Sequence, residues 1–182
     1  MAIHWYPGHM HKATREMTKI LPEVDLVIEL LDARLPASSQ NPVIAALSQT
    51  KPCIKILSKS DLADPETTTA WQDHFEQDAS VKTLQTMLDQ ADKAQKVTRL
   101  CQALVPGKAL ENLRIVAMVA GIPNVGKSTL INALAGRRVT KTGDEPAITK
   151  SQQRIKLEEG ITLLDTPGIL WPKIENENSG YR

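Results

Sequence analysis

Aromatic residues and cysteines are few in this sequence, and long apolar runs are missing from it. Trp, Tyr and Phe make up 3% of the residues, which disfavours a surface that stacks nucleic-acid bases. The two cysteines, Cys53 and Cys101, lack the spacing of a metal site, so we expect buried or half-buried thiols in a reducing compartment. No run reaches the length of a membrane span, and the N-terminal residues lack the pattern of a signal peptide. We therefore expect a cytoplasmic protein with no membrane partner.

Overall charge is nearly balanced. The 182 residues carry a formal net charge of +1, with 41% apolar and 24% charged residues, as in ordinary globular domains. This balance neither favours nor excludes a nucleic-acid partner. The length suits one domain with a small appendage, and we divide the chain into an N-terminal segment at 1–20, a domain at 21–175 and a tail at 176–182.

Strand patterns and helix patterns alternate along the chain. Helices are predicted at 10–20, 42–47, 65–75, 89–105 and 127–134. Buried or half-buried strands are predicted at 24–31, 52–57, 81–84, 114–120, 151–157 and 161–164. This alternation predicts an α/β fold with a mostly parallel sheet flanked by helices on both faces.

Residues 121–128 (GIPNVGKS) match the phosphate-loop pattern G-x-x-x-x-G-K-[ST]. The match lies between a strand pattern and a helix pattern, which makes a chance glycine turn a weak alternative. In such a loop backbone N–H groups surround phosphate oxygens, Lys127 brings positive charge to the β- and γ-phosphates, and Ser128 coordinates Mg²⁺. We assign the nucleotide contacts of this loop to Asn124, Val125, Gly126, Lys127, Ser128 and Thr129.

Residues 165–168 (DTPG) follow the last predicted strand. Alone this is an ordinary turn sequence, but about 40 residues after a phosphate loop it indicates a segment that holds the metal ion. Asp165 ends a buried strand, which is the position from which such an aspartate holds Mg²⁺. We expect the N–H of Gly168 to reach the γ-phosphate.

Residues 58–61 (SKSD) also follow a buried strand and resemble the guanine-reading pattern N-K-x-D. We expect the Asp61 carboxylate to accept hydrogen bonds from guanine and the Lys59 stem to pack over the base, with Ser58 and Ser60 completing the loop. Adenine would leave that carboxylate unpaired. Ser58 replaces the expected asparagine; it can still tether the loop, but affinity for guanine is expected to be weaker, so an ATPase stays an alternative.

The order of these segments is informative. In ordinary small GTPases the phosphate loop precedes the base-reading motif, whereas here 58–61 precedes 121–128 and Asp165 comes last. A circular permutation preserves the site, because parallel strands bring their following loops to one edge of the sheet. A second base-contacting loop is expected near Thr86, after the strand at 81–84. The sequence therefore predicts a circularly permuted P-loop GTPase domain.

Four segments carry a resemblance to a known family: 5–10 (WYPGHM), 32–36 (DARLP), 121–128, and 165–172 (DTPGILWP). Together they resemble the ribosome biogenesis GTPase A family of bacteria, over essentially the whole chain. The resemblance implies GTP and GDP as ligands with Mg²⁺, and a monomer that assists late assembly of the large ribosomal subunit. It also implies a further C-terminal helical domain that contacts ribosomal RNA, of which the tail at 176–182 would be the start.

Ile169 occupies the place where Ras-like enzymes carry a glutamine that orients the attacking water. An apolar side chain cannot polarise water, so we expect slow hydrolysis unless the ribosome stimulates it; a nucleotide-dependent binding module with negligible turnover is the alternative. His9 is a candidate catalytic residue beside Lys127, because imidazole exchanges protons near neutral pH and the matching histidine of the family is implicated in catalysis. We expect His9 on a mobile segment hinged at Pro7 and Gly8; a surface or helix-capping role is the alternative.

The resemblance also implies two cation contacts. In related GTPases an asparagine at the position of Asn124 helps to bind K⁺, which would neutralise charge that develops during the reaction; otherwise Asn124 only suits the loop geometry. Thr149 is the expected switch threonine, whose hydroxyl joins Mg²⁺ in the GTP state. Nearby basic residues either face RNA or form a solvated surface, and both interpretations stay open; they are Arg137, Arg138, Lys141, Lys150 and Arg154.

Overall fold

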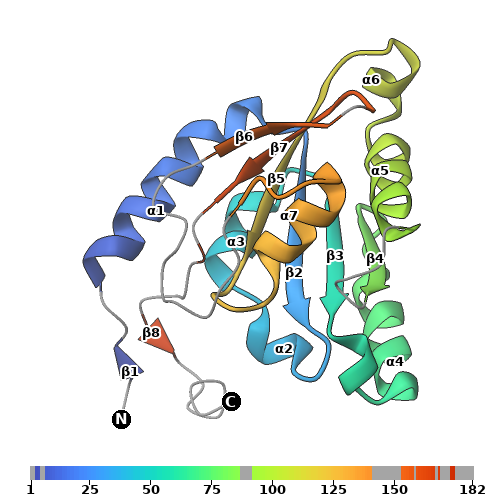
Figure 1. Cartoon of the computed structure of the whole chain (residues 1–182). Helices are drawn as coiled ribbons and strands as arrows, with labels where there is room; N and C mark the ends of the chain where they lie inside the picture. The colour runs from blue at the N-terminus through green and yellow to red at the C-terminus, as the bar shows by residue number, and fades with distance from the viewer. Residues whose placement is uncertain are drawn as a thin grey trace.

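A six-stranded sheet forms the centre of the domain (Figure 1). The computed structural model describes residues 3–4, 7–86, 92–140, 153–157, 159–166, 168 and 173–174. The strands of the sheet are β2 (Leu26–Asp32), β3 (Cys53–Ser58), β4 (Val81–Thr86), β5 (Ile115–Gly121), β6 (Gln153–Lys156) and β7 (Ile161–Asp165). Their order is β4-β3-β2-β5-β7-β6; β6 is antiparallel to β7, and the other neighbours are parallel. The predicted α/β fold with a mostly parallel sheet is confirmed.

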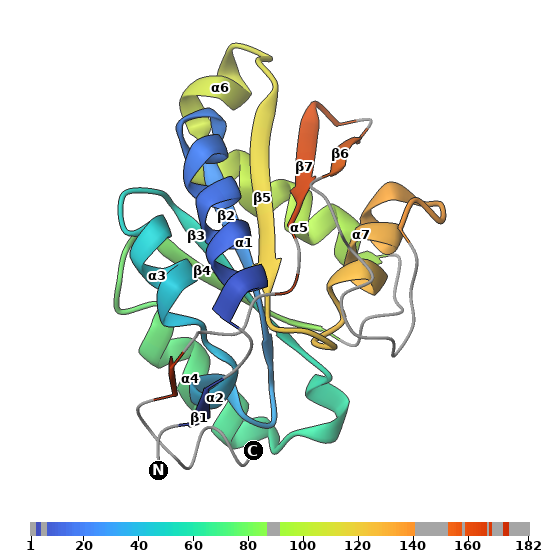
Figure 2. The ribbon, with the colours of Figure 1, turned by 90° about the vertical axis from the view of Figure 1, so that its left-hand side faces the viewer.

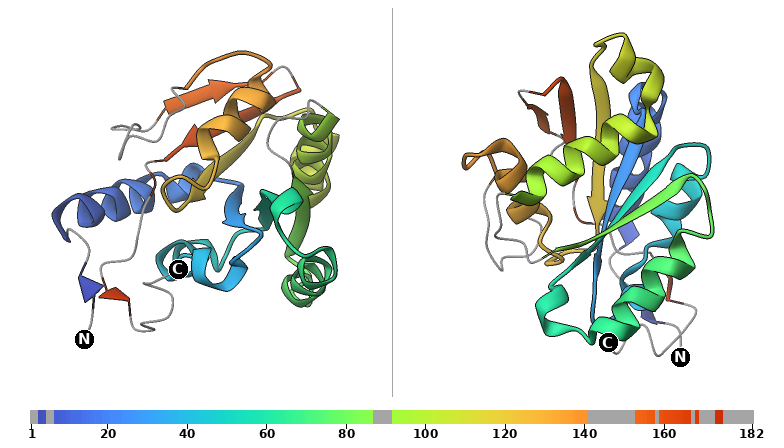
Figure 3. Two further views of the ribbon diagram at one scale, coloured as in Figure 1. Left: turned by 60° about the horizontal axis from the view of Figure 1, so that its bottom comes forward. Right: turned by 90° about the vertical axis from the view of Figure 1, so that its right-hand side faces the viewer.

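Helices cover both faces of this sheet. They are α1 (Pro7–Ile20), α3 (Pro42–Ser48), α4 (Pro65–Phe75), α5 (Asp92–Leu104) and α7 (Lys127–Ala135). On one face α1, α3 and α4 contribute Met17, Ile44 and Phe75 to one core cluster, and on the other α5 and α7 contribute Cys101 and Ile131 to a second. Figure 2 shows α1 and α3 in front of the strands with α5 behind, and the right panel of Figure 3 shows α5 from its own side.

The central strands β2 and β3 are buried along their whole length. Along β2, Ile28 and Leu30 face the cluster of α5 and α7, while Val27 and Leu31 face the cluster of α1, α3 and α4. A parallel strand covered on both faces needs apolar residues at successive positions rather than at alternate ones. This requirement explains why the two runs were recognisable as strands in the sequence.

One ion pair lies inside this apolar sheet. Glu29 and Lys55 stand opposite each other in the register of β2 and β3, with Nζ and Oε2 2.5 Å apart. Their residues are 1% and 7% exposed. The N–H of Asn41, at the start of α3, donates to Glu29 Oε1 at 3.3 Å, and Lys55 Nζ lies 5.1 Å from the ring centre of Phe75 in α4. The pair therefore links two strands to the beginning of one helix and the end of another.

The N-terminal helix differs from our expectation. We predicted a helix from residue 10 and a hinge at Pro7 and Gly8, but α1 begins at Pro7 and includes both residues. Proline suits the first position of a helix, because its missing N–H needs no partner there. Met17 is fully buried, so the C-terminal half of α1 packs against the core of the domain. The predicted hinge is thus replaced by the first turn of a helix.

Several short elements were not predicted. They are η1 (Leu21–Glu23), α2 (Pro36–Ser39), η2 (Ser60–Leu62), α6 (Pro106–Leu110), and the antiparallel pair β1 (Ile3–His4) and β8 (Lys173–Ile174). α5 ends before Pro106 as expected, but Pro106 then opens α6 as its first residue, a position that proline tolerates. α2 likewise begins at a proline.

Both thiols are buried, as predicted: Cys53 is 6% exposed and Cys101 is fully covered. Burial raises the pKa of each thiol to about 12, because the thiolate would be removed from water. Within the described part of the chain, no helix combines the length and the apolar character that a bilayer crossing requires.

Candidate nucleotide-binding site

The candidate site lies where the parallel strands end. Parallel strands place the loops that follow them at one edge of the sheet, and ligands of open α/β sheets bind at that edge. In Figure 1 the arrowheads of β2, β3 and β4 all point towards the lower side of the molecule. The last residues of β2, β3, β5 and β7 are Asp32, Ser58, Gly121 and Asp165. The three segments selected from the sequence therefore meet at one edge.

The phosphate loop connects β5 to α7. Two of its residues adopt left-handed backbone conformations, Asn124 at φ 60° and Gly126 at φ 100°. Gly126 caps α7, so the first N–H groups of that helix, starting with Lys127, point out of its N-terminus together with the positive end of its dipole. Ser128 and Thr129 lie half-buried in the first turn of α7. This geometry fits a phosphate group, for which helix N-termini of this kind are suited.

Lys127 and Asp165 form an ion pair at the centre of the edge. The Lys127 ammonium donates to Asp165 Oδ1, and the side chains are 8% and 0% exposed. The two residues come from the start of α7 and the end of β7. A buried cation and a buried carboxylate stabilise each other here, and each has the chemistry to meet a nucleotide: ammonium for phosphate, carboxylate for a metal ion.

The segment after β7 packs on the phosphate loop. Thr166 Oγ1 donates to the carbonyl of Val119 at 2.7 Å, and its backbone N–H approaches the same oxygen at 3.3 Å. A Cβ at Gly168 would lie 3.1 Å from both Cα and N of Pro123, so a larger residue would push the two segments apart. The glycine of this motif thus permits the close approach of the two segments. Its contact with the γ-phosphate stays a prediction.

The base-reading loop is tied to the phosphate loop by Ser58. The Ser58 hydroxyl is fully buried and lies 2.9 Å from the carbonyl oxygens of Leu31 and Val125, to which its single proton can donate in turn. This is the tethering that we expected from a serine in place of the asparagine. Lys59 follows in the left-handed conformation at φ 57°, and Asp61 lies exposed in η2.

The loop after β2 contributes a residue that we had not selected. Lys59 Nζ donates to Asp32 Oδ2 at 3.1 Å and to the carbonyl of Asn124 at 3.3 Å. The N–H of Ala33 donates to the carbonyl of Ser58 at 2.8 Å. Three loops are therefore joined at one point. The sequence does contain a signal for this contact. Asp32 ends one buried strand, and Lys59 directly follows the next buried strand.

The residues predicted to hold Mg²⁺ fit a metal that is bound mainly by phosphate oxygens. Asp165 and Ser128 supply a carboxylate and a hydroxyl from adjoining elements, and hard oxygen ligands are those that Mg²⁺ prefers. Within the described residues no group of three or more His, Cys, Asp and Glu side chains is placed to hold a metal by itself. Mg²⁺ bound here would supply charge neutralisation at the phosphates.

Other predicted residues lie at the margin of what the structure describes. Thr149 and Ile169 lie outside the described residues, and His9 lies in the first turn of α1, where only the backbone is described. Thr86 ends β4 beside Ser58 in the register and is 2% exposed. The roles assigned to these residues stay predictions.

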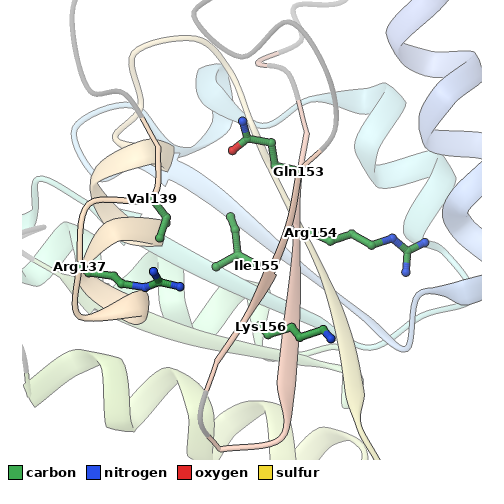
Figure 4. A pocket seen from close by; sticks show the side chains of 6 residues that line it. All are labelled: Arg137, Val139, Gln153, Arg154, Ile155 and Lys156. Atoms are coloured by element: carbon green, nitrogen blue, oxygen red, sulfur yellow. The ribbon is translucent and has the colours of Figure 1, made fainter.

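The basic residues beyond α7 line a groove of about 520 Å³ at the edge strand β6. Figure 4 shows the side chains of Arg137, Val139 and Ile155 on one side of β6, while those of Arg154 and Lys156 extend to the other. Arg154 forms an exposed ion pair with Glu23 at 2.6 Å. The groove residues are distinct from those of the phosphate loop, so this surface is a separate feature of the domain.

The fold, with a base-reading loop that precedes the phosphate loop and an aspartate that follows it, defines a circularly permuted P-loop GTPase domain. A family model described as "50S ribosome-binding GTPase" matches residues 116–182. The chain is 48% identical to Ribosome biogenesis GTPase A of Bacillus pumilus, with 100% of this chain and 67% of that protein covered. It is 37% identical to the Thermotoga maritima protein of the same name, with 96% and 62% covered.

Solved structures agree with these relatives. GNP-bound YlqF from T. maritima superposes with a TM-score of 0.65 at 30% identity, covering 92% of this chain and 62% of that one. The GDP-bound form of YlqF gives a TM-score of 0.65 at 28% identity, with 91% and 63% covered. The chain belongs to the ribosome biogenesis GTPase A family, and it is a GTPase of the P-loop class that binds GTP and GDP. It spans about two thirds of the length of the first curated relatives that it matches.

Proposed function

We propose that this chain is a GTP-driven switch that assists late assembly of the large ribosomal subunit. The observation that supports this best is the buried contact between Lys127 and Asp165, at the same edge as the loop at 58–61. With a nucleotide bound, Lys127 would lie against the β- and γ-phosphates in place of Asp165, and Asp165 and Ser128 are the residues that would hold Mg²⁺ to neutralise phosphate charge. A pair that is broken by GTP and Mg²⁺ is a suitable element of a switch.

Hydrolysis is proposed to be slow in the isolated chain. Ile169 cannot orient water, so the assignment of His9 as the catalytic group depends on its approach to the γ-phosphate on the ribosome. A His9→Ala variant should bind GTP normally and lose the stimulated turnover; full stimulation of that variant would reject the role. Asn124, exposed in the phosphate loop, is proposed to hold K⁺, and equal GTPase rates in KCl and NaCl would reject that role.

The proposed partner is ribosomal RNA of the large subunit. We propose that the chain binds it as a monomer, in the cytoplasm. The description of the matching family model and the names of the relatives support a ribosomal partner. Arg137 and Arg138 are exposed beyond α7, and Arg137 lines the groove at β6, so these two arginines are the candidate contacts for phosphate groups. Clustered arginines and lysines bind phosphate backbones without reading sequence, and such binding weakens as salt rises.

The test is pelleting with large ribosomal subunits. The chain should sediment with subunits in the presence of a non-hydrolysable GTP analogue and far less with GDP. Single-turnover hydrolysis with and without subunits then separates the two candidate functions. Stimulation supports the GTPase switch, whereas nucleotide-dependent binding without any stimulation supports the alternative, a binding module with negligible turnover. Sedimentation that is the same with the GTP analogue and with GDP contradicts both candidate functions.

A further inference from the structure

Asp32 is held firmly by its own loop. Arg34 Nε and Nη2 donate to its two carboxylate oxygens at 2.9 and 2.7 Å, and the N–H of Arg34 donates to Oδ1 at 3.0 Å. The N–H of Asp32 donates to Ser39 Oγ at 3.0 Å, and that hydroxyl donates to the carbonyl of Leu35 at 2.8 Å. The carboxylate is therefore a fixed negative charge at the end of β2.

This carboxylate stays ionised in the folded protein. Burial opposes the charge, but the hydrogen bonds from Arg34 and Lys59 outweigh it and lower the pKa of Asp32 from 3.8 to about 2. The Asp32 side chain is 11% exposed, so little water competes for it. Arg34 is 46% exposed and comes from the same loop, whereas Lys59 reaches the carboxylate from a different loop.

Lys59 is fixed at both ends. Its backbone has the left-handed conformation directly after β3, and its ammonium lies between Asp32 Oδ2 at 3.1 Å and the carbonyl of Asn124 at 3.3 Å. A free lysine side chain samples many rotamers, and ordering it on binding costs conformational entropy. Here the four-carbon stem is already extended from the base-reading loop to the phosphate loop before any ligand arrives.

We propose that Asp32 is a positioning residue for the guanine nucleotide: it anchors the Lys59 ammonium so that the lysine stem forms a preordered platform for the base. The proposal rests on the assignment of residues 58–61 as the base-reading loop. A preordered platform strengthens binding because the ordering cost is met in the free protein. Residues 58–61 are assigned to the base, which GDP and GTP share, so the platform should strengthen the binding of both nucleotides by the same factor.

The experiment is equilibrium binding of fluorescent GDP and of a non-hydrolysable GTP analogue to five variants and the unmodified chain. Asp32→Asn should reduce the affinity for both nucleotides by the same factor, about five- to twentyfold, as expected for the loss of one charge-assisted hydrogen bond. Lys59→Met should weaken them at least as much. The double variant should bind the nucleotides no more weakly than Lys59→Met, because both changes disrupt the same Asp32–Lys59 contact.

Arg34→Met separates positioning from loop structure. It removes the clamp within the loop but leaves the carboxylate free to bind Lys59, so affinity should stay within about twofold of the unmodified chain. Asp78→Asn is the matched control: Asp78 accepts from the N–H of Ser80 in the exposed turn before β4, at the opposite end of that strand from the site, and this change should leave nucleotide binding unaltered. Thermal unfolding confirms that each variant is folded.

Three results would overturn the proposal. Asp32→Asn could bind nucleotides as tightly as the unmodified chain, the double variant could lose affinity by the product of the two single losses, or Arg34→Met could lose as much affinity as Asp32→Asn. If Asp32→Asn does not fold, Asp32→Glu replaces it, because this change moves the carboxylate by one methylene. Asp32→Glu must then reduce the affinity for both nucleotides by the same factor. Normal affinity in this variant would overturn the proposal. If the unmodified chain bound no guanine nucleotide, the proposed function would fail first, and this inference with it.

Discussion

The Lys127 ammonium at the start of α7 contacts the Asp165 carboxylate at the end of β7, and both groups are shielded from water. Neither charge is well solvated in this position, so each depends on the other for its stability. The same two groups are those that a nucleoside triphosphate with Mg²⁺ would engage. Stability of the ligand-free domain and affinity for the nucleotide are therefore coupled through one contact.

Lys127→Met should reduce both quantities. Removing the ammonium leaves Asp165 buried without its cation, and we expect the free energy of unfolding to fall by about 3 kcal/mol and GTP affinity by about a hundredfold or more. Denaturant titration without nucleotide and equilibrium binding are the measurements. Lys108→Met is the control, because Lys108 pairs with Asp25 at 2.8 Å in a partly exposed position and should cost less than Lys127→Met, about 1 kcal/mol, without affecting binding. Unchanged stability and affinity in Lys127→Met would contradict the account.

The Glu29–Lys55 pair should behave as a structural unit away from the nucleotide. Glu29→Gln should lower the free energy of unfolding by about 3 kcal/mol, since the Lys55 ammonium would lose its buried counter-charge. The double change Glu29→Met with Lys55→Met should recover most of that loss, because two apolar side chains suit the site. GDP affinity should be unaltered in every folded variant. Additive losses in the double variant would show that the two residues act independently.

Ser58→Ala tests the tether between the base-reading loop and the phosphate loop. The change removes the only side-chain donor of Ser58, which lies 2.9 Å from the carbonyl oxygens of Leu31 and Val125. We expect a loss of about 1–2 kcal/mol in the free energy of unfolding and weaker GDP binding. Ser80→Ala, at an exposed turn, is the matched control and should change neither. Normal stability in Ser58→Ala would mean that the tether contributes nothing.

The strands and the phosphate loop could be predicted because their determinants are local. Buried parallel strands need unbroken apolar runs, and the loop at 121–128 has a fixed pattern between a strand and a helix. The end of the helix predicted at 89–105 was close to that of α5, but the start of α6 at Pro106 was not predicted, because proline can either follow the end of a helix or open a new one. The same ambiguity placed a hinge at Pro7, where the structure has the first turn of α1.

Contacts between loops were harder to predict. Asp32 meets Lys59 across 27 residues, and their approach depends on the order in which β2 and β3 lie in the sheet. A sequence pattern does not contain that order. The pairing of Glu29 with Lys55 had a usable signal, since the two residues are charges of opposite sign in the middle of two buried strands. Such a charge needs a buried partner, and the neighbouring strand is where one can lie.

Acid should weaken the loop around Asp32 in a defined range. The pKa of Asp32 is lowered from 3.8 to about 2, so the ionised carboxylate stabilises the fold fully above pH about 5, and this contribution fades as pH falls towards 2. The stability difference between the unmodified chain and Asp32→Asn should shrink by about 2 kcal/mol between pH 5 and pH 2. Urea titrations across that range measure it. A difference that does not depend on pH would contradict the assigned ionisation.

The two thiols should be inert in the folded protein. Burial raises the pKa of Cys53 and Cys101 to about 12, and the thiolate is the reactive form. An aromatic disulfide reagent at pH 8 should therefore modify neither cysteine on the timescale on which it modifies the denatured chain. Complete reaction in denaturant provides the reference. Rapid modification of either thiol under native conditions would show that its side chain is accessible.

The most direct measurement of the central claim is competition at equilibrium, with unlabelled GTP, GDP, ATP and ADP each displacing a fluorescent guanine nucleotide in the presence of Mg²⁺. The account predicts that GTP and GDP displace the probe while ATP and ADP do so only at concentrations at least about a hundredfold higher, because adenine leaves the Asp61 carboxylate unpaired. Displacement by ATP as readily as by GTP would contradict a guanine-specific site at residues 58–61.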